Sequence, residues 1–227
     1  MRENSARMRQ ARKLERKAGG RPPYPRVLMV CEGEETEPNY LEEIRQEYRI
    51  PTAHWAVLPS DYGTGPERVV AYAKAKARRD DSWDEVYCIF DRDDHAYYRE
   101  AIGAARALDG KLRTRVPAAP IRFTAIPSVP CFELWFLLHF EAVTREEHRD
   151  AITRRLKAWI PDYEKHLDDM FARTRERLAA AYVHAADERR RASVSGNDNP
   201  STDVDLLVRR LIEIGDMRRD CLNPRSS

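Results

Sequence analysis

Two short apolar runs limit the folds available to this chain more than any other feature. They cover residues 27–31 and 86–90, and both contain β-branched side chains. A run of this length without alternating polar positions is typical of a strand buried on both faces, as in parallel sheets. The chain is therefore expected to build an α/β core around these strands.

The segments around the two runs alternate between strand and helix patterns. Strands are expected at 27–31, 54–59, 85–90 and 121–126, and helices from Thr36, over 66–79 and over about 95–108. This alternation predicts a mainly parallel sheet of about four strands, flanked by helices and joined by right-handed crossovers.

The rest of the chain is expected to be helical. The apolar segment 127–140 predicts a buried helix beneath the carboxyl edge of the sheet, after a loop stiffened by Pro127 and Pro130. Residues 144–147 match a helix capping box, an Arg-rich helical pattern covers about 163–191, and Ser201 or Thr202 is expected to cap a last amphipathic helix. The predicted organisation is a basic N-terminal arm (1–26), an α/β core (27–140) and a helical C-terminal extension that packs on the core (141–227).

Each of the two apolar runs ends in an acidic cluster. Glu32 follows the first run, and Asp91 and Asp93 follow the second. Because parallel strands end at one edge of the sheet, where ligands bind, these carboxylates are expected to converge there. Converging carboxylates repel one another unless a hard cation binds them, so the pattern favours a Mg²⁺ or Mn²⁺ site. The alternative is that these residues only cap the helices that follow.

Three further residues are candidates with two interpretations each. Glu133 is an acid within an apolar segment, where it is expected either to bind the metal or to pair with an arginine such as Arg122. His95 either contacts a phosphate or lies solvated at a helix start. His139 is favoured as a core histidine, because its spacing from Glu133 does not place the two on one helical face.

The distribution of charge suggests a nucleic-acid partner more than the net charge does. The net formal charge is only +2, but residues 1–26 carry nine Arg and Lys against two Glu. Such an arm attracts phosphate through counterion release, and the alternative is a solvated N-terminus. The residues predicted to contact nucleic acid are Arg9, Arg12, Lys13, Arg16, Lys17 and Arg92.

The sequence is expected to belong to a cytoplasmic protein that does not span a membrane. It has no apolar run approaching ~18 residues and no signal-peptide pattern after its basic start. Its four cysteines are scattered without a CxxC pair, so a zinc site or a disulfide framework is not indicated. P-loop, GxSxG, GxGxxG and HExxH motifs are also absent, which removes support for the activities that depend on them.

Four motifs in order resemble the RloB-like family. They are CEGEETEPNY at 31–40, FDRDDH at 90–95, PCFELW at 130–135 and NPST at 199–202. Glu32 and the Asp91-x-Asp93 pair also resemble the catalytic residues of the Toprim domain, which topoisomerases, primases and OLD-family nucleases share. The resemblance covers nearly the whole chain and implies a Toprim-like fold with a divalent-metal site.

The resemblance also implies a role in bacterial phage defence, because RloB-like proteins are associated with restriction and abortive-infection loci. Two departures weaken the assignment of a reaction. Asp94 and His95 replace the glycine that usually follows the DxD pair, and no downstream lysine of the kind used by OLD nucleases can be assigned.

The leading hypothesis is therefore a Mg²⁺-dependent nuclease that hydrolyses phosphodiester bonds of RNA or DNA, with Glu32, Asp91 and Asp93 as catalytic residues. Glu133 is expected to be a fourth metal ligand. The alternative is a non-catalytic component that binds nucleic acid or another protein of a defence system.

Overall fold

A five-stranded sheet forms the centre of the molecule. The structure, a computed structural model, describes residues 24–92, 95–115 and 118–222. The strands are β1 (Val27–Cys31), β2 (Trp55–Pro59), β3 (Glu85–Asp91), β4 (Arg122–Val129) and β5 (Ser201–Thr202). Their order is β2-β1-β3-β4-β5, and all pairs are parallel except the antiparallel pair of β4 and β5. The predicted α/β class with a mainly parallel sheet is confirmed.

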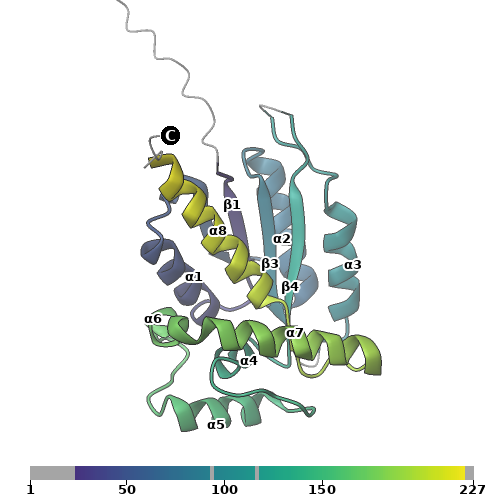
Figure 1. Cartoon of the computed structure of the whole chain (residues 1–227). Helices are drawn as coiled ribbons and strands as arrows, with labels where there is room; N and C mark the ends of the chain where they lie inside the picture. The colour runs from purple at the N-terminus through teal and green to yellow at the C-terminus, as the bar shows by residue number, and fades with distance from the viewer. Residues whose placement is uncertain (1–23, 93–94, 116–117, 223–227) are drawn as a thin grey trace, which may run out of the picture.

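Helices cover both faces of this sheet. Alternate residues of β1 and β3 point to opposite faces, and since nearly all of them are apolar and buried, both faces need a covering layer. Helices α1 (Thr36–Glu47) and α8 (Val204–Leu222) share one apolar cluster with Met29 and Ile89. Helices α2 (Pro66–Arg79) and α3 (Tyr98–Leu108) share the other cluster with Val30 and Cys88. Figure 1 shows α8 crossing in front of the strands, with α2 and α3 behind and beside them.

The remaining helices lie below the carboxyl ends of the strands (Figure 1). They are α4 (Glu133–Leu137), α5 (Arg149–Trp159), α6 (Met170–Thr174) and α7 (Leu178–Ser195), with the 3₁₀ turn η2 (Arg175–Arg177) between α6 and α7; the other 3₁₀ turn, η1 (Thr52–His54), directly precedes β2. Helix α4 is buried along its whole length. Its Trp135 indole donates a hydrogen bond of 2.9 Å to the Tyr40 hydroxyl of α1, so α4 is fixed against the sheet's covering layer. The predicted buried helix beneath the sheet edge is thus confirmed, although it is short.

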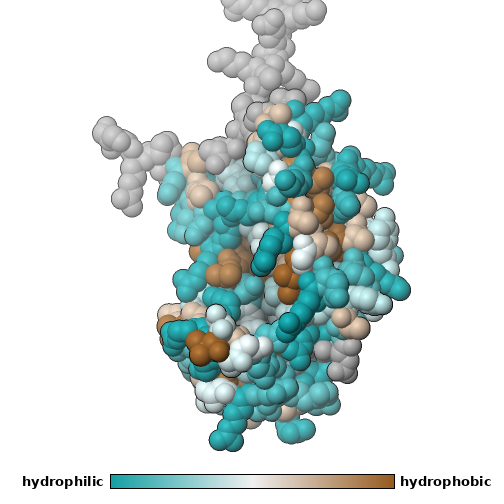
Figure 2. All heavy atoms as spheres, turned by 90° about the vertical axis from the view of Figure 1, so that its right-hand side faces the viewer, coloured by the Kyte–Doolittle hydropathy of each residue, from teal (hydrophilic) through white to brown (hydrophobic). Residues whose placement is uncertain are grey.

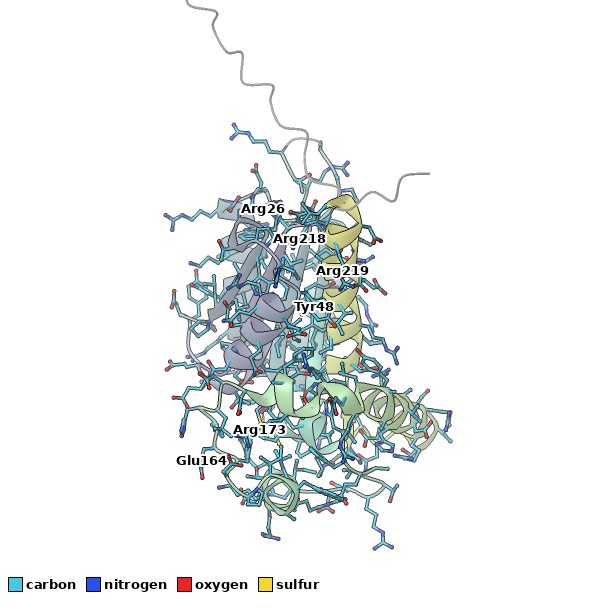
Figure 3. The ribbon with its side chains drawn as sticks, turned by 60° about the vertical axis from the view of Figure 1, so that its left-hand side comes forward. Arg26, Tyr48, Glu164, Arg173, Arg218 and Arg219 are labelled. Carbon is cyan, nitrogen blue, oxygen red and sulfur yellow. The ribbon has the colours of Figure 1, made fainter. Side chains whose placement is uncertain are left out.

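Helices α1 and α8 approach each other closely (Figure 3). A Cβ atom placed on Gly215 of α8 would lie 2.6 Å from Cβ of Tyr48, which follows the end of α1. Real Cβ contacts are essentially never this short, so only glycine fits at this crossing. The close contact helps to bring α8 down onto the apolar cluster that contains Leu207, Leu211 and Ile214.

Pro127 lies inside β4, not in the loop where it was predicted. The hydrogen bonds from Arg122 N to Asp84 O and from Arg92 N to Ser128 O show that even-numbered residues of β4 face β3. The nitrogen of Pro127 therefore faces the other side, where no ladder hydrogen bond is needed. Its carbonyl accepts a hydrogen bond of 3.0 Å from Asp203 N.

The capping box predicted at 144–147 is wrong. Helix α5 begins at Arg149, and the side chain of His148 accepts a hydrogen bond from Asp150 N. Glu147 is instead held by Asn199, which accepts from Glu147 N at 3.3 Å and donates to Glu147 O at 3.0 Å. A tertiary contact thus takes the backbone groups that a capping box would use.

The long helix predicted over 163–191 is also divided, into α6, η2 and α7. Helix α6 starts where Glu43 of α1 accepts hydrogen bonds from Phe171 N and Ala172 N, at 3.0–3.2 Å. Near its end, the Thr174 hydroxyl donates back to Met170 O at 2.6 Å, a contact that tends to bend helices. The side chain of a distant helix therefore determines this boundary.

Two other predicted helix starts differ in detail. Thr36 is the first residue of α1 and not its cap, and its hydroxyl donates to Lys165 O at 3.2 Å. Thr202 lies in β5, while its hydroxyl accepts a hydrogen bond of 3.2 Å from Val204 N at the start of α8. Thr202 therefore contributes to both elements, which explains why the capping pattern hid a short strand.

Substitution Glu43→Ala is expected to lower the free energy of unfolding by about 1–2 kcal/mol, because it leaves two amides at the start of α6 without their carboxylate. Urea unfolding measures the loss. The control is Glu47→Ala, which removes an exposed ion pair with Arg175 and is expected to cost under about 1 kcal/mol. Equal losses in the two variants would contradict the capping role.

Candidate functional site

A cleft of about 420 Å³ opens at the carboxyl edge of the sheet. Its lining includes carboxylates from three segments that are distant in sequence. We call it the acidic cleft, and its lining residues are Glu32, Gly33, Glu34, Glu35, Thr36, Glu37, Thr64, Asp91, His95, Phe132, Glu133, Arg149 and Lys165. The structure therefore brings together Glu32, Asp91 and Glu133, three of the four residues predicted as metal ligands.

Glu32 is held in place by three hydrogen-bonding groups. Its backbone amide donates to Ile89 O at 3.0 Å, which extends the β1–β3 ladder by one step. Its carboxylate accepts from Asp91 N at 3.0 Å and from Gly65 N at 3.2 Å, and the His95 ring nitrogen Nε2 lies 3.1 Å from Oε1. The ends of β1 and β3 are thus connected through this one side chain, only 13% of which is exposed.

The loop after β2 has a direct part in the site. Gly65, which directly precedes α2, donates its backbone amide to Glu32. Gly65 has a φ of +121°, a backbone conformation that residues other than glycine rarely adopt. Glycine is needed here to aim the amide at the carboxylate.

Glu133 lies in the wall of the acidic cleft at the start of α4 and is 3% exposed. The Tyr163 hydroxyl donates to its carboxylate at 3.3 Å. Burial, followed by the charges of Glu133 and Asp91, raises the pKa of the neighbouring Cys131 thiol. Arg122 lies at the opposite end of β4, so the alternative pairing of Glu133 with Arg122 is wrong.

Glu37 is a buried carboxylate of the cleft that sequence reasoning missed. It is 6% exposed and accepts a hydrogen bond of 3.3 Å from Gly33 N. Burial, with the charges of Glu133 and Glu32, raises its pKa to about 7. Glu37 shares a helical face with Tyr40, so the period of the buried face of α1 was the available signal.

The cleft also has two cations that the sequence did not indicate. Arg149 starts α5, and Lys165 lies in the segment between α5 and α6. The Thr36 hydroxyl fixes the backbone of Lys165 beside the start of α1. Neither residue belongs to a sequence motif. Tertiary packing brings both of them to the carboxylates, so no local pattern could indicate them.

The donor set fits a hard divalent cation in chemical type, since six carboxylates line one recess. The pKa of Glu37 is raised first by burial and then by the charges of Glu133 and Glu32, and a bound cation would relieve this repulsion. However, within the described part of the chain no set of three or more acidic, His or Cys side chains is already arranged to hold a metal ion. Asp93, the fourth predicted ligand, lies outside the described residues.

Of the residues predicted to contact nucleic acid, only Arg92 lies in the described part of the chain. Its guanidinium pairs with Asp198, and it lines a second cleft next to the acidic cleft. The residues of the basic arm (Arg9, Arg12, Lys13, Arg16 and Lys17) lie outside the described residues. His139 lies in the core, where burial lowers its pKa to about 4 and Nδ1 lies 2.9 Å from Trp135 O.

The arrangement places acidic, basic and titratable groups around one recess. Carboxylates of this kind bind cations and orient water, while Arg149, Lys165 and His95 can contact a phosphate oxygen.

Comparison with known proteins gives one match. A protein-family model described as "RloB-like protein" matches residues 27–211. No curated protein and no solved structure matches. Over the ranges that the structure describes, none of the helices combines the length and apolarity needed to cross a membrane.

Proposed function

Because the chain belongs to the RloB-like family, and because its acidic cleft collects six carboxylates beside Arg149 and Lys165, we propose that it is a Mg²⁺-dependent nuclease acting on RNA or DNA. The observation that carries this proposal is the position of Glu32. Its carboxylate joins the ends of two parallel strands and faces the cleft where Asp91 and Glu133 also lie. A Mn²⁺ ion would suit the same oxygen ligands.

In this proposal Asp91, Asp93 and Glu133 hold the cation, together with Glu32. When bound, the divalent ion supplies charge stabilisation at the phosphoryl oxygens and lowers the pKa of a water molecule. Glu32 is kept in one orientation by the Asp91 and Gly65 amides, so no reorganisation of this side chain is needed during the reaction. Lys165 and Arg149, which line the same cleft, would bind the non-bridging oxygens of the scissile phosphate.

The proposal extends the Toprim resemblance. Glu32 takes the place of the Toprim glutamate, and Asp91 and Asp93 take the places of its DxD pair. Lys165 is our candidate for the lysine that OLD nucleases use, which no motif in the sequence identified. The role in phage defence rests on the family's association with restriction and abortive-infection loci.

Addition of Mg²⁺ or Mn²⁺ is expected to start cleavage of labelled RNA or DNA and to raise the thermal midpoint by about 3–5 °C, because the cation removes repulsion among Glu32, Glu37 and Glu133. EDTA is expected to reverse both effects. Gel electrophoresis measures cleavage, and differential scanning fluorimetry measures the midpoint.

Asp91→Asn provides the control, since it removes one proposed ligand while keeping the size of the side chain. It is expected to lose both cleavage and most of the thermal shift. An equal shift in Asp91→Asn and wild-type protein would show that the cation binds elsewhere.

A second candidate function is non-catalytic binding of nucleic acid or of another defence protein. The favouring observation is that both oxygens of Glu32 already have donors within the protein. Tight binding of nucleic acid that EDTA does not change, with no cleavage under Mg²⁺, Mn²⁺ or Ca²⁺, would select this candidate.

A further inference from the structure

Two more clefts continue from the acidic cleft across the carboxyl face of the molecule. The middle cleft has a volume of about 500 Å³ and shares His95 and Arg149 with the acidic cleft. The far cleft, of about 510 Å³, shares Glu146 and Asn199 with the middle one and ends at the C-terminal part of α7. We call these three joined clefts the trough.

Arginine side chains occur along the trough beyond the carboxylates. Arg92 and Arg149 line the middle cleft, and Arg190 and Arg191 line the far cleft. Each guanidinium has five donors, and the ion pairs of Arg92 with Asp198 and of Arg190 with Asp187 use only a part of them. These arginines can therefore contact phosphate without losing their present partners.

The two acids of the middle and far clefts are already engaged. Glu147 accepts from Arg155 at 3.0 Å, and Glu146 accepts from Asn197 at 3.3 Å. Figure 2 shows the side of the molecule that carries α3 and the C-terminal end of α7. The lower part of this surface is mainly hydrophilic. The far cleft combines its arginines with a lining that is more apolar than polar, and such a lining suits the bases of a nucleic acid while the arginines suit its phosphates.

The depth of the acidic cleft restricts what can enter it. Glu37 and Glu133 are 6% and 3% exposed, so a phosphate must enter the recess to reach them. The phosphates of a duplex are held on a stiff, wide cylinder. A single strand can bend into the recess and continue along the neighbouring clefts.

From these observations we propose that the trough binds single-stranded nucleic acid, with one phosphate in the acidic cleft and the neighbouring nucleotides running past Arg149 to the end of α7. The proposal rests on the proposed nuclease function for the role of the acidic cleft. Its new content is the path of the strand and the preference for single strands over duplexes.

Binding is tested with the full chain in Ca²⁺, which takes the same kind of oxygen ligands as Mg²⁺ and offsets the negative charge of the acidic cleft, and gel electrophoresis checks that the probes stay intact. The probes are fluorescein-labelled oligo(dT) and oligo(U) of about 12 nucleotides, and a duplex of the same length. Fluorescence anisotropy at low salt is expected to show single strands binding at least about tenfold more tightly than the duplex.

Two substitutions at the far end of the trough test the path. Arg190→Glu and Val194→Glu are each expected to weaken single-strand binding by about five- to tenfold, because each places a negative charge beside the strand. Both positions are exposed (Val194 by 85%), so the fold is expected to tolerate the changes.

The chain offers matched controls for both variants. Arg219 forms an i,i+3 ion pair of 2.8 Å with Asp216 on α8, as Arg190 does with Asp187 on α7, and its side chain is similarly exposed. Val183 is 59% exposed on the same helix as Val194. Neither Arg219 nor Val183 lines the trough, so Arg219→Glu and Val183→Glu are expected to bind like wild type.

The outcomes separate this proposal from the nuclease proposal. If single strands bind with the expected dependence on Arg190 and Val194 but no metal supports cleavage, the trough is supported and the nuclease fails. If cleavage depends on Glu32 while the trough variants bind as tightly as their controls, or if the duplex binds as tightly as single strands, the trough proposal is wrong.

Discussion

Glu32→Gln is expected to reduce metal-dependent cleavage by at least about a hundredfold in kcat/KM. Glutamine has nearly the same shape, but it replaces one carboxylate oxygen with an amide group. The NH₂ of the glutamine would face the backbone N–H of either Asp91 or Gly65. Both of these groups donate to the carboxylate of Glu32, so a donor would then face a donor. The variant therefore loses a charge at the proposed metal and also the orientation of the side chain.

Single-turnover cleavage and urea unfolding together measure this effect. A small loss of stability is expected, because an N–H group that loses its acceptor costs about 1–3 kcal/mol. The control is Glu176→Gln, an exposed glutamate in η2 outside the acidic cleft, which is expected to cleave like wild type. A folded Glu32→Gln protein that retained more than about a tenth of the activity would show that cleavage occurs at another site.

The second large effect is expected for Glu188 in α7, whose side chain controls how stability depends on pH. The residue is 1% exposed, and among the described residues neither carboxylate oxygen has a hydrogen-bond partner. Burial raises its pKa to about 8, while Val143, Arg191 and Arg189 partly oppose the shift. In the unfolded chain the same group has a pKa of 4.5.

Because the folded-state pKa is the higher one, the folded protein binds this proton more tightly than the unfolded chain. The stabilisation is fully present below pH 4.5 and is lost as the pH rises to about 8. The loss over this range is on the order of 4 kcal/mol. Glu37, with a pKa of about 7, contributes a change of the same sign up to that pH.

Glu188→Gln is therefore expected to match wild type at about pH 5 and to be several kcal/mol more stable at about pH 9. Urea unfolding at a series of pH values measures the difference between the two proteins. The variant keeps the weaker dependence that comes from Glu37. Parallel curves for the two proteins would contradict the assignment of the proton to Glu188.

The sheet could be predicted from sequence because each parallel strand has a local signal. The apolar runs of β1 and β3 and the Pro66 start of α2 depend on residues close together in the chain. Strand β5 has only two residues, and it pairs with the end of β4 because α7 and α8 bring it there. No periodic pattern can mark so short an element.

The residues of the candidate site could likewise be predicted only where a local sequence signal marks them. Glu32 and Asp91 follow strands, so topology alone places them at one edge. Glu37 had a signal in the period of α1, while Lys165 and Arg149 had none. The start of α6 was equally hidden, because the cap comes from Glu43 of a helix that is distant in sequence.

The way the acidic cleft is assembled has a consequence for protein synthesis. Its lining runs from Glu32 to Lys165, and the apolar cluster beneath it continues to Ile214 in α8. A chain still being translated has the strand-end carboxylates but lacks Arg149, Lys165 and the helices that close the core. The cleft is therefore expected to be complete only after α8 has been synthesised and has packed onto this cluster.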